Sequence, residues 1–383
     1  MTQSTFTQEE LLRYSRHLMI PEVGLEGQKR LKSTSVLIVG AGGLGSPAAL
    51  YLAAAGIGHL GLVDDDVVDA SNLQRQILHG SRQIGKPKVD SGRERLMDLN
   101  PFIKLDTYCS SFNQKTAMEI AAGYDILVDC SDNFATRYLI NDLCALTARP
   151  DVYGAVYRFE GQVSVFDARR GPCYRCLFPE PPAEGVAPTC GEAGVFGVVP
   201  GVIGTLQAAE VIKLALGAGE PLIGKFLVFD ALEMSFRTIK LTKRQGCQLC
   251  GEHPKITHLI DYECFCSINT EKALDAPDMI TVKELAARLK GVNPPLLLDV
   301  RTPVEAQVSA LEGAVMIPME HLAERMAELN NYREREIVVF CRTGTRSKRA
   351  LHQLKAKGFS KVKDLTGGIN AWAQQIDLDM FQY

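Results

Sequence analysis

The sequence lacks an excess of positive charge, a long apolar run and a secretory leader pattern, and each absence excludes a class of protein. The 383 residues carry a formal net charge of −3, so the chain has no basic field of the kind that binds nucleic acid or an anionic membrane. Residues 1–10 do not follow the charged-then-apolar order of a signal peptide, and no apolar run approaches the length of a membrane span. We therefore expect a cytoplasmic protein with neither nucleic acid nor membrane as a partner.

The phosphate-loop signature GxxxxGK[ST] is also absent. The glycine-rich segment 40–47 carries no lysine, which disfavours γ-phosphoryl transfer in the manner of P-loop enzymes. We find no internal repeat or low-complexity tract. With 46% hydrophobic and 23% charged residues, the chain can bury a large core and is long enough for two domains.

Cysteine, by contrast, is abundant, with eleven residues. Four of them form two CxxC pairs, Cys173 with Cys176 and Cys247 with Cys250, next to turn-forming glycines. Thiolates at this spacing are ligands for one tetrahedral zinc ion, and four sulfur ligands leave no open position for water or substrate. We expect the zinc to hold a long crossover in place and to take no part in the chemistry. The alternative is four unrelated buried thiols.

Short apolar runs alternate with helical stretches and predict an α/β fold with a Rossmann-like, doubly wound sheet. Residues 35–40 are typical of a buried parallel strand, a glycine turn opens a helix through residue 55, and a second strand is expected at 60–64. The turn reads Gly-Ala-Gly-Gly-Leu-Gly, and Asp64 follows its last glycine by nineteen residues. A glycine turn in this βαβ context predicts a nucleotide site with a phosphate at the helix N-terminus.

Polar residues follow the predicted strands at the edge of the sheet where ligands of parallel sheets lie. Asn72 and Arg75 come after the second strand, Lys88 follows soon afterwards, and Asp132 ends the fourth strand. Asn72, Arg75 and Lys88 could neutralise a triphosphate, and Asp132 could hold Mg²⁺ beside the scissile bond. Each residue taken alone is equally typical of a solvated loop charge or a helix cap.

The second half of the chain predicts a crossover, a linker and a smaller domain. Residues 177–197 are rich in proline and glycine and should form a mobile crossover loop, followed by a small-residue helix from about residue 201 to residue 216. Residues 252–278 show no firm pattern and are predicted to link a first domain, 1–251, to a second α/β domain, 279–383. In the second domain, Thr281 can cap a helix, and buried-strand runs follow at intervals.

Several motifs together resemble the MoeB/ThiF adenylyltransferases, relatives of the ubiquitin-activating enzymes. The resemblance covers residues 7–251 and is carried by RYSR, GAGGLGS, SNLQRQ, GKPKV, DCSDN, TCGEAG and the two CxxC pairs. It implies that the C-terminal Gly-Gly of a ubiquitin-like sulfur-carrier protein is activated as an acyl adenylate with ATP and Mg²⁺. It also implies that the four paired cysteines hold a structural zinc and that Asp132 is the metal-associated catalytic carboxylate. The nucleotide site that it implies comprises Arg16, which reaches the partner subunit of a homodimer, and Gly43, Asp64, Ser71, Asn72, Arg75, Lys88, Asp132 and Asn133.

The second domain resembles a rhodanese in the order of its motifs, LDVR, GAVMIP, CRTGTRS and LTGGINAW. Cys341 ends a strand, and its loop runs into a helix from about Ser347. Loop N–H groups, the helix dipole and Arg346 can therefore stabilise a thiolate or persulfide. The Cys-x4-Arg loop is one residue shorter than the phosphatase loop, which favours sulfur over phosphate. Residues 307–312, which precede Gly313-Ala314, differ from the sequence usual in rhodaneses at this turn. The alternative for Cys341 is a buried thiol at the end of a strand.

The two resemblances combine into one reaction. ATP converts a carboxylate into a mixed anhydride with AMP, and a Cys341 persulfide, formed from a persulfide donor or thiosulfate, attacks that carbonyl and leaves a thiocarboxylate. Cys190 on the crossover loop either forms a transient acyl or disulfide link or is a plain loop thiol. Two other classes stay open: an NAD-dependent oxidoreductase with the same glycine turn and Asp64, and a non-catalytic scaffold that docks a ubiquitin-like protein. The carrier could serve molybdopterin, thiamine, cysteine or tRNA thiolation.

Overall fold

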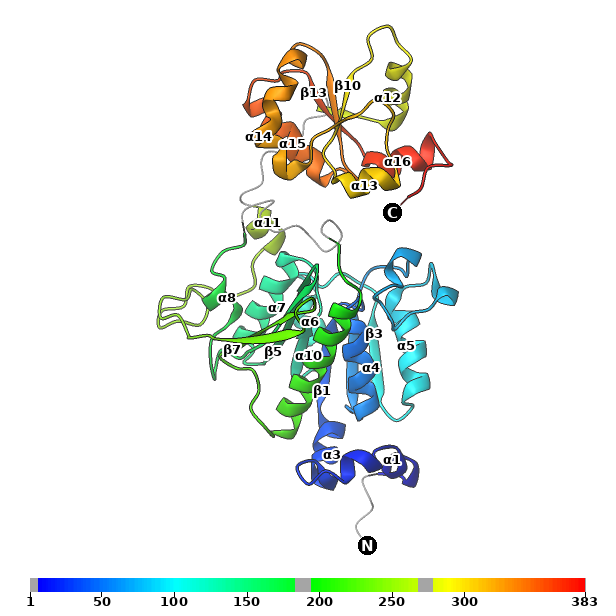
Figure 1. Cartoon of the computed structure of the whole chain (residues 1–383). Coiled ribbons are helices and arrows are strands. Elements are labelled where there is room, and N and C mark those ends of the chain that lie inside the picture. The colour runs from blue at the N-terminus through cyan, green and yellow to red at the C-terminus, as the bar shows by residue number, and fades with distance from the viewer. Residues whose placement is uncertain (1–5, 183–193, 268–277, 383) are drawn as a thin grey trace. The chain divides into compact units, whose positions relative to one another are not determined.

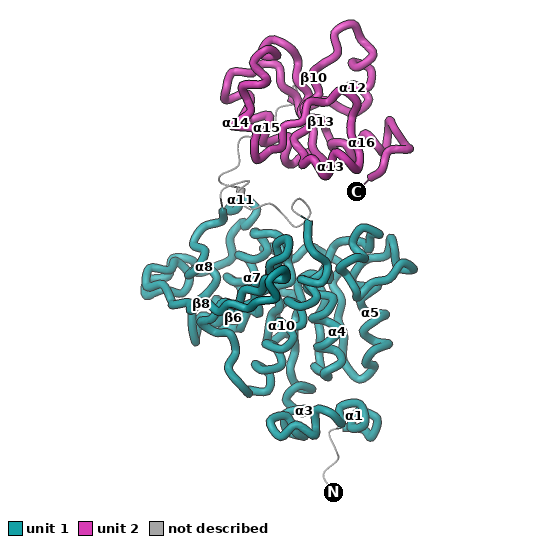
Figure 2. Tube along the Cα trace, viewed as in Figure 1, with its two compact units in different colours: residues 1–269 teal, residues 270–383 magenta. Residues whose placement is uncertain are grey.

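The structure is a computed structural model that describes residues 6–182, 194–267 and 278–382 (Figure 1). The chain divides into two compact units, residues 1–269 and 270–383 (Figure 2). Each unit is an α/β domain with its own sheet, which confirms the predicted fold class.

The first unit contains an eight-stranded sheet in the order β3-β2-β1-β4-β5-β6-β7-β8. Strands β1 to β5 pair in parallel, and β6 to β8 continue the sheet in antiparallel fashion. The strands are β1 (Ser35–Val39), β2 (His59–Val63), β3 (Lys104–Tyr108), β4 (Ile126–Asp129), β5 (Asp151–Tyr157), β6 (Glu160–Phe166), β7 (Lys225–Asp230) and β8 (Ser235–Lys240).

Helices cover both faces of this sheet, which explains why β1 reads as a continuous apolar run. Side chains alternate along a strand, so Val36 and Ile38 pack with α4 and α10 while Leu37 and Val39 pack with α6 and α7 (Figure 1). The helices of the unit are α1 (Gln8–Arg13), α2 (Ser15–Leu18), α3 (Gly24–Ser33), α4 (Gly45–Ala55), α5 (Lys88–Leu99), α6 (Ala117–Ala121), α7 (Phe134–Leu146), α8 (Tyr174–Leu177), α10 (Val198–Leu216) and α11 (Tyr262–Ser267), with short 3₁₀ turns η1 (Ala70–Asn72) and η2 (Ser81–Gln83).

Helix α10 is the one described helix that is long and apolar enough to cross a membrane. The sequence predicts a helix here that begins about one turn later, near residue 201. In the structure, Ile203 and Val211 of α10 belong to the main apolar core of the first unit, and the helix packs against α4, β5 and β6. Its apolar character is therefore that of a core helix of the first unit.

Two segments of the first unit differ from the sequence-based expectation. The apolar spacing from Glu9 to Ile20 is typical of one amphipathic helix. In the structure this helix is broken at Tyr14, whose buried hydroxyl accepts a hydrogen bond from Asn100 Nδ2 at 2.9 Å. Within the predicted linker, residues 262–267 form helix α11, which packs on α7. Both differences arise from tertiary packing, which overrides weak local patterns.

The second unit is built on a parallel five-stranded sheet in the order β11-β10-β12-β13-β9. Its first helix begins with the cap that the sequence indicates, because Thr281 Oγ1 accepts from the backbone of Glu284 while the Glu284 side chain accepts from Thr281. The elements are β9 (Met279–Ile280), α12 (Val282–Leu289), β10 (Leu296–Asp299), α13 (Pro303–Val308), β11 (Val315–Met316), η4 (Met319–His321), α14 (Leu322–Arg325), η5 (Met326–Tyr332), β12 (Ile337–Phe340), α15 (Thr345–Ala356), β13 (Val362–Leu365) and α16 (Gly368–Gln375).

A buried ion pair fastens α8 and α11 to α7. Arg175 Nε and Nη2 donate to the two carboxylate oxygens of Asp142 at 2.7 and 2.8 Å, and Tyr262 Oη donates to the same carboxylate at 2.8 Å. The Arg175 guanidinium lies over the rings of Tyr138 and Phe265. Three helices that are distant in the sequence therefore depend on one carboxylate.

We predict that Arg175→Met lowers the free energy of unfolding of the first unit by about 3 kcal/mol or more, because it leaves Asp142 buried without its cation. Urea unfolding followed by far-UV circular dichroism measures the effect. The fluorescence of Trp372, the only tryptophan in the sequence, reports on the unfolding of the second unit. The urea midpoint of that transition should be the same in Arg175→Met as in the wild type. Arg95→Met, which breaks an exposed pair with Asp98, serves as the matched control and should cost less than about 1 kcal/mol. Equal stabilities of the two variants would contradict this assignment.

Candidate functional sites

The glycine turn between β1 and α4 brings the backbone closer to its neighbours than a side chain would allow. Gly40 has a φ of +101°, and a Cβ atom there would lie 2.7 Å from the carbonyl oxygen of Cys130. A Cβ atom on Gly45 would lie 1.9 Å from the carbonyl oxygen of Gly40. The turn is fastened to the end of β2, because Asp64 Oδ2 accepts a hydrogen bond from the backbone N–H of Ala41 at 2.8 Å. These close approaches require glycine at both positions of the predicted turn.

A cavity of about 240 Å³ opens at the carboxyl ends of β1, β2 and β4. Six of the residues predicted for the nucleotide site line it: Gly43, Asp64, Arg75, Lys88, Asp132 and Asn133. Ser71 and Asn72 lie beside it on η1, where Asn72 Oδ1 accepts from Gln76 Nε2 at 2.8 Å and Gln76 reaches the cavity wall. Arg16 lies apart, exposed on α2, with Nη1 3.9 Å from Met19 Sδ.

Lys88 is the buried cation of this cavity. Its Nζ lies 2.8 Å from Asp66 Oδ2 and 3.8 Å from Asp64 Oδ1. Burial raises the pKa of Asp64, although the charge of Lys88 and two backbone hydrogen bonds act in the opposite direction. The exposed Asp66 carboxylate can exchange for an anionic ligand without disturbing the fold, so this arrangement can receive a phosphate group.

The loop after β4 places Asp132 at the mouth of the cavity and uses Asn133 as a helix cap. Asp132 is exposed, and Asn133 Oδ1 accepts from the backbone N–H of Thr136 at 2.9 Å to begin α7. Arg137, one turn further along α7, also lines the cavity and lies over the rings of Phe134 and Tyr153. Arg137 was not among the predicted site residues. Its position four residues after Asn133 nevertheless places it at the N-terminal end of α7, the same end that carries Asp132 and Asn133.

The four paired cysteines meet in one cluster. Their sulfur atoms all lie within 4.8 Å of one another, with Cys173 Sγ 3.6 Å from Cys247 Sγ and Cys176 Sγ 3.4 Å from Cys250 Sγ. The first pair lies at α8 and the second in the turn after β8. A cluster of this size and composition can hold a metal ion, and it joins the segment at the start of the crossover loop to the turn after β8.

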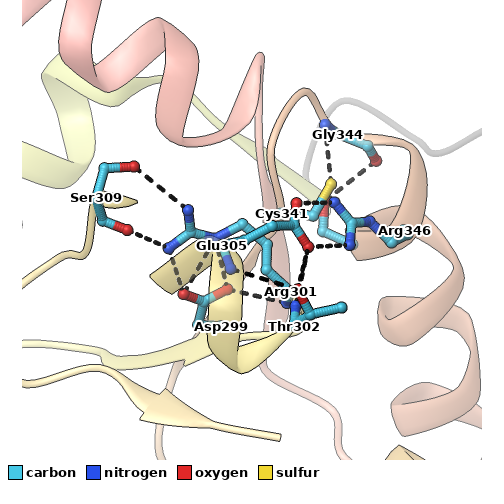
Figure 3. Close-up of polar contacts among 9 residues, drawn as sticks. Asp299, Arg301, Thr302, Glu305, Ser309, Cys341, Gly344 and Arg346 are labelled. Atoms are coloured by element: carbon cyan, nitrogen blue, oxygen red, sulfur yellow. Dashed lines mark hydrogen bonds and ion pairs between the residues drawn. The ribbon is translucent and has the colours of Figure 1, made fainter. Parts of the chain in front are cut away.

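In the second unit, Cys341 follows β12 directly and its sulfur lies inside the loop that leads into α15. Sγ accepts a hydrogen bond from the backbone N–H of Gly344 at 3.1 Å and one from Ser347 Oγ at 3.5 Å. Figure 3 shows the guanidinium of Arg346 directed at Glu305 of α13, with which it forms two hydrogen bonds. One hydrogen-bond donor from the loop and one from the first turns of α15 thus reach this sulfur.

A buried carboxylate, Asp364 of β13, lies under the same loop. Its Oδ2 is 3.9 Å from the position that a Cβ atom on Gly344 would take. Burial raises its pKa to about 6, although Ser347 and the charge of Lys348 lower it in part. No signal in the sequence marks Asp364 as a buried site residue, because an acidic residue within a short strand is usually expected at the exposed edge of a sheet.

Cys190, the other predicted catalytic cysteine, lies outside the described residues. Cys264 and Cys266 lie on α11, where Cys264 is exposed and Cys266 packs against the core below it.

Family models and curated relatives match both units. The model described as "ThiF family" matches residues 14–249, and the model described as "Rhodanese-like domain" matches residues 281–375. A probable adenylyltransferase/sulfurtransferase MoeZ of Mycobacterium tuberculosis is 46% identical over 99% of this chain and 97% of its own length. The adenylyltransferase and sulfurtransferase MOCS3 of Sus scrofa is 44% identical over 100% of this chain and 89% of its own length.

Solved structures resemble about three fifths of this chain. A crystal structure of Escherichia coli MccB with MccA-N7isoASN is 25% identical, with a TM-score of 0.57 over 63% of this chain and 75% of that chain. A crystal structure of MccB with ATP is 25% identical, with a TM-score of 0.55 over 62% of this chain and 74% of that chain.

The raised pKa of Asp364 predicts a pH-dependent stability of the second unit. Because the folded state holds this proton up to about pH 6 while the unfolded chain releases it near 3.8, the free energy of unfolding should fall as the pH rises through that window. The loss should reach about 3 kcal/mol above it. Asp364→Asn should remove the loss, so that its stability relative to the wild type increases between about pH 4 and about pH 7. Urea unfolding followed by Trp372 fluorescence measures the unfolding free energies of the wild type and of Asp364→Asn. If the difference between these two free energies does not change with pH, the assignment is refuted.

Proposed function

Because the chain belongs to the ThiF family and continues into a rhodanese-like domain, we propose that its two units act in sequence on the C-terminal Gly-Gly of a ubiquitin-like sulfur carrier. The chain is an adenylyltransferase and a sulfurtransferase, as its full-length relatives are named. The first unit adenylates the carrier, and the second transfers sulfur to it. An NAD-dependent oxidoreductase or a non-catalytic scaffold is not favoured, because neither accounts for both domains.

The cavity at the edge of the first sheet is the observation that carries the nucleotide assignment. Residues that follow three neighbouring strands surround one space, and three cations and four carboxylates line it together. In our proposal, ATP binds there with its ribose at Asp64 and its phosphates at the glycine turn, Arg75 and Lys88. The phosphate site is completed from η1 by Asn72 and Ser71, and Asn133 lies beside the catalytic Asp132.

Adenylation requires the carrier's carboxylate oxygen to attack the α-phosphorus of ATP while the bond to the pyrophosphate oxygen breaks. Arg75 and Lys88 would bind the phosphates and stabilise the charge that develops on them. Asp132 would hold Mg²⁺, which supplies electrostatic stabilisation of the leaving pyrophosphate. Its exposed position at the cavity mouth suits a residue that must reach a metal on the nucleotide.

The cysteine cluster would hold Zn²⁺ as a structural ion. Support comes from its four thiol ligands, from the spacing of their sulfur atoms and from the place of Cys173 and Cys176 beside the buried Arg175–Asp142 pair. Four sulfur ligands saturate a tetrahedral ion, so we assign it no step of the reaction.

Sulfur transfer is assigned to Cys341. Its thiolate attacks the outer sulfur of a donor, and the terminal sulfur of the resulting persulfide attacks the acyl adenylate and releases AMP. A second thiolate must then break the S–S bond to free the thiocarboxylate, and Cys190 is our candidate for it, with an external thiol to reduce the disulfide that forms. Arg346 would support the loop that holds the anionic sulfur.

The partners follow from the same scheme. The carrier is the macromolecular partner, and a persulfide or thiosulfate is the sulfur donor. We infer a homodimer in which exposed Arg16 reaches the nucleotide site of the second copy, and a cytoplasmic location in which the thiols stay reduced.

Asp132→Ala should fold normally and lower adenylation by roughly 10²-fold or more, because it removes the carboxylate that positions metal beside the developing phosphate charge. Carrier-dependent exchange of pyrophosphate into ATP measures this step. Asp98→Ala, an exposed carboxylate on α5 away from the cavity, is the matched control and should retain full exchange. Near-normal pyrophosphate exchange by Asp132→Ala would contradict the assignment of Asp132 as the catalytic carboxylate.

A further inference from the structure

The guanidinium of Arg346 is engaged by a carboxylate from another helix. Nη1 donates to Glu305 Oε2 at 2.7 Å, and Nη2 donates to Glu305 Oε1 at 2.6 Å (Figure 3). Both side chains are largely buried, with 11% and 16% of their surface exposed. Such a two-point pair fixes the orientation of the guanidinium as well as its charge.

Glu305 is itself held in place from the other side. Oε2 accepts hydrogen bonds from the backbone N–H of Thr302 at 2.9 Å and from Thr302 Oγ1 at 3.0 Å, as part of the capping box that begins α13. Burial alone would raise the pKa of Glu305, but the hydrogen bonds from Arg346 and Thr302 lower it to about 2. The carboxylate is therefore charged throughout the physiological range, and it cannot follow Arg346 without losing its helix cap.

This arrangement sets the charge that a sulfur donor meets at Cys341. The Arg346 guanidinium is neutralised by Glu305, and Asp364 adds a second carboxyl group beneath the loop. The other cations of the loop and of the first turns of α15 are Arg342, Lys348 and Arg349, of which Lys348 is exposed. Thiosulfate carries negative charge on the sulfonate group that is bonded to the transferred sulfur, and this group must compete with Glu305 for Arg346. An organic persulfide has no charged group bonded to the transferred sulfur and meets no such competition.

We propose that Glu305 is a specificity-determining residue that withholds Arg346 from sulfur donors that carry a sulfonate group, so that the second unit takes its sulfur from a persulfide. The inference rests on the proposed sulfur transfer to Cys341 and names the donor class for it. With a persulfide, a bond forms between Cys341 Sγ and the outer sulfur, the donor S–S bond breaks, and the donor leaves as a thiolate. With thiosulfate, the same bond forms and sulfite leaves. Neither step needs an oxidant or a reductant.

The test compares the two donors in the full-length chain, with glutathione persulfide or thiosulfate as donor, cyanide as acceptor and thiocyanate as the measured product. Glu305→Gln keeps the capping box, because glutamine serves the same N3 position, but it removes the charge that holds Arg346. The ratio of kcat/KM for thiosulfate to kcat/KM for the persulfide should rise about tenfold, through a lower KM for thiosulfate, because the released guanidinium can form one charge-assisted hydrogen bond with the donor.

The chain contains its own matched control. Glu284 occupies the same N3 position in the capping box of α12 and is exposed, so Glu284→Gln should leave the donor ratio unchanged. Glu305→Gln combined with Arg346→Gln should abolish the rise in the ratio, because the rise depends on the released guanidinium. Thr302→Val removes the hydroxyl that donates a hydrogen bond to Glu305, and it provides a second variant in case Glu305→Gln folds poorly. It should shift the ratio in the same direction by a smaller amount.

Two failures are distinguishable by mass spectrometry of the chain. If wild-type Cys341 takes up a sulfur atom from either donor and the ratio is the same in Glu305→Gln, in Thr302→Val and in the wild type, the specificity inference is overturned while sulfur transfer stands. If the wild type and Cys341→Ser both fail to take up sulfur from either donor, the proposed sulfur transfer is itself wrong, and the inference falls with it.

Discussion

The carboxyl ends of parallel strands meet at one edge of a sheet, and both candidate sites of this chain depend on that constraint. In the first unit the strand order places β1 between β2 and β4, so the glycine turn, Asp64 and Asp132 follow three neighbouring strands and surround one cavity. In the second unit β10 lies beside β12, so the loop after β12 that carries Cys341 lies next to α13, which follows β10 and carries Glu305. Each site lies where the chain leaves neighbouring strands for different elements, as is usual for parallel sheets.

Both sites hold a cation against a carboxylate of their own. Lys88 contacts Asp66 in the first unit, and Arg346 contacts Glu305 in the second. The two pairs differ in how easily a ligand can replace the carboxylate. Asp66 is 72% exposed, so solvent compensates for its release, whereas Glu305 is 16% exposed and is tied to the cap of α13. In our proposal, a phosphate therefore displaces the first carboxylate readily, whereas a donor with a sulfonate group meets resistance at the second.

The parts of the fold that local pattern determines could be predicted from the sequence. The glycine turn, the apolar strands and the paired cysteines were all recognisable, because tight turns, buried strands and metal sites each demand particular residues at short spacing. The break at Tyr14, helix α11 and the roles of Glu305 and Asp364 were missed. Most of these depend on a partner that is distant in the sequence, such as Asn100 for Tyr14 or Arg346 for Glu305, and no local signal marks such pairs.

The central claim is that the two units perform successive steps on the same carrier, and the mass of the carrier after reaction tests it most directly. Cys341→Ser should still convert ATP and a Gly-Gly carrier into AMP-linked carrier, because adenylation needs no thiol of the second unit, but it should form no thiocarboxylate. The wild type with the same donor should form the thiocarboxylate. A thiocarboxylated carrier made at the normal rate by Cys341→Ser, with the second unit as the sole source of sulfur, would contradict the account.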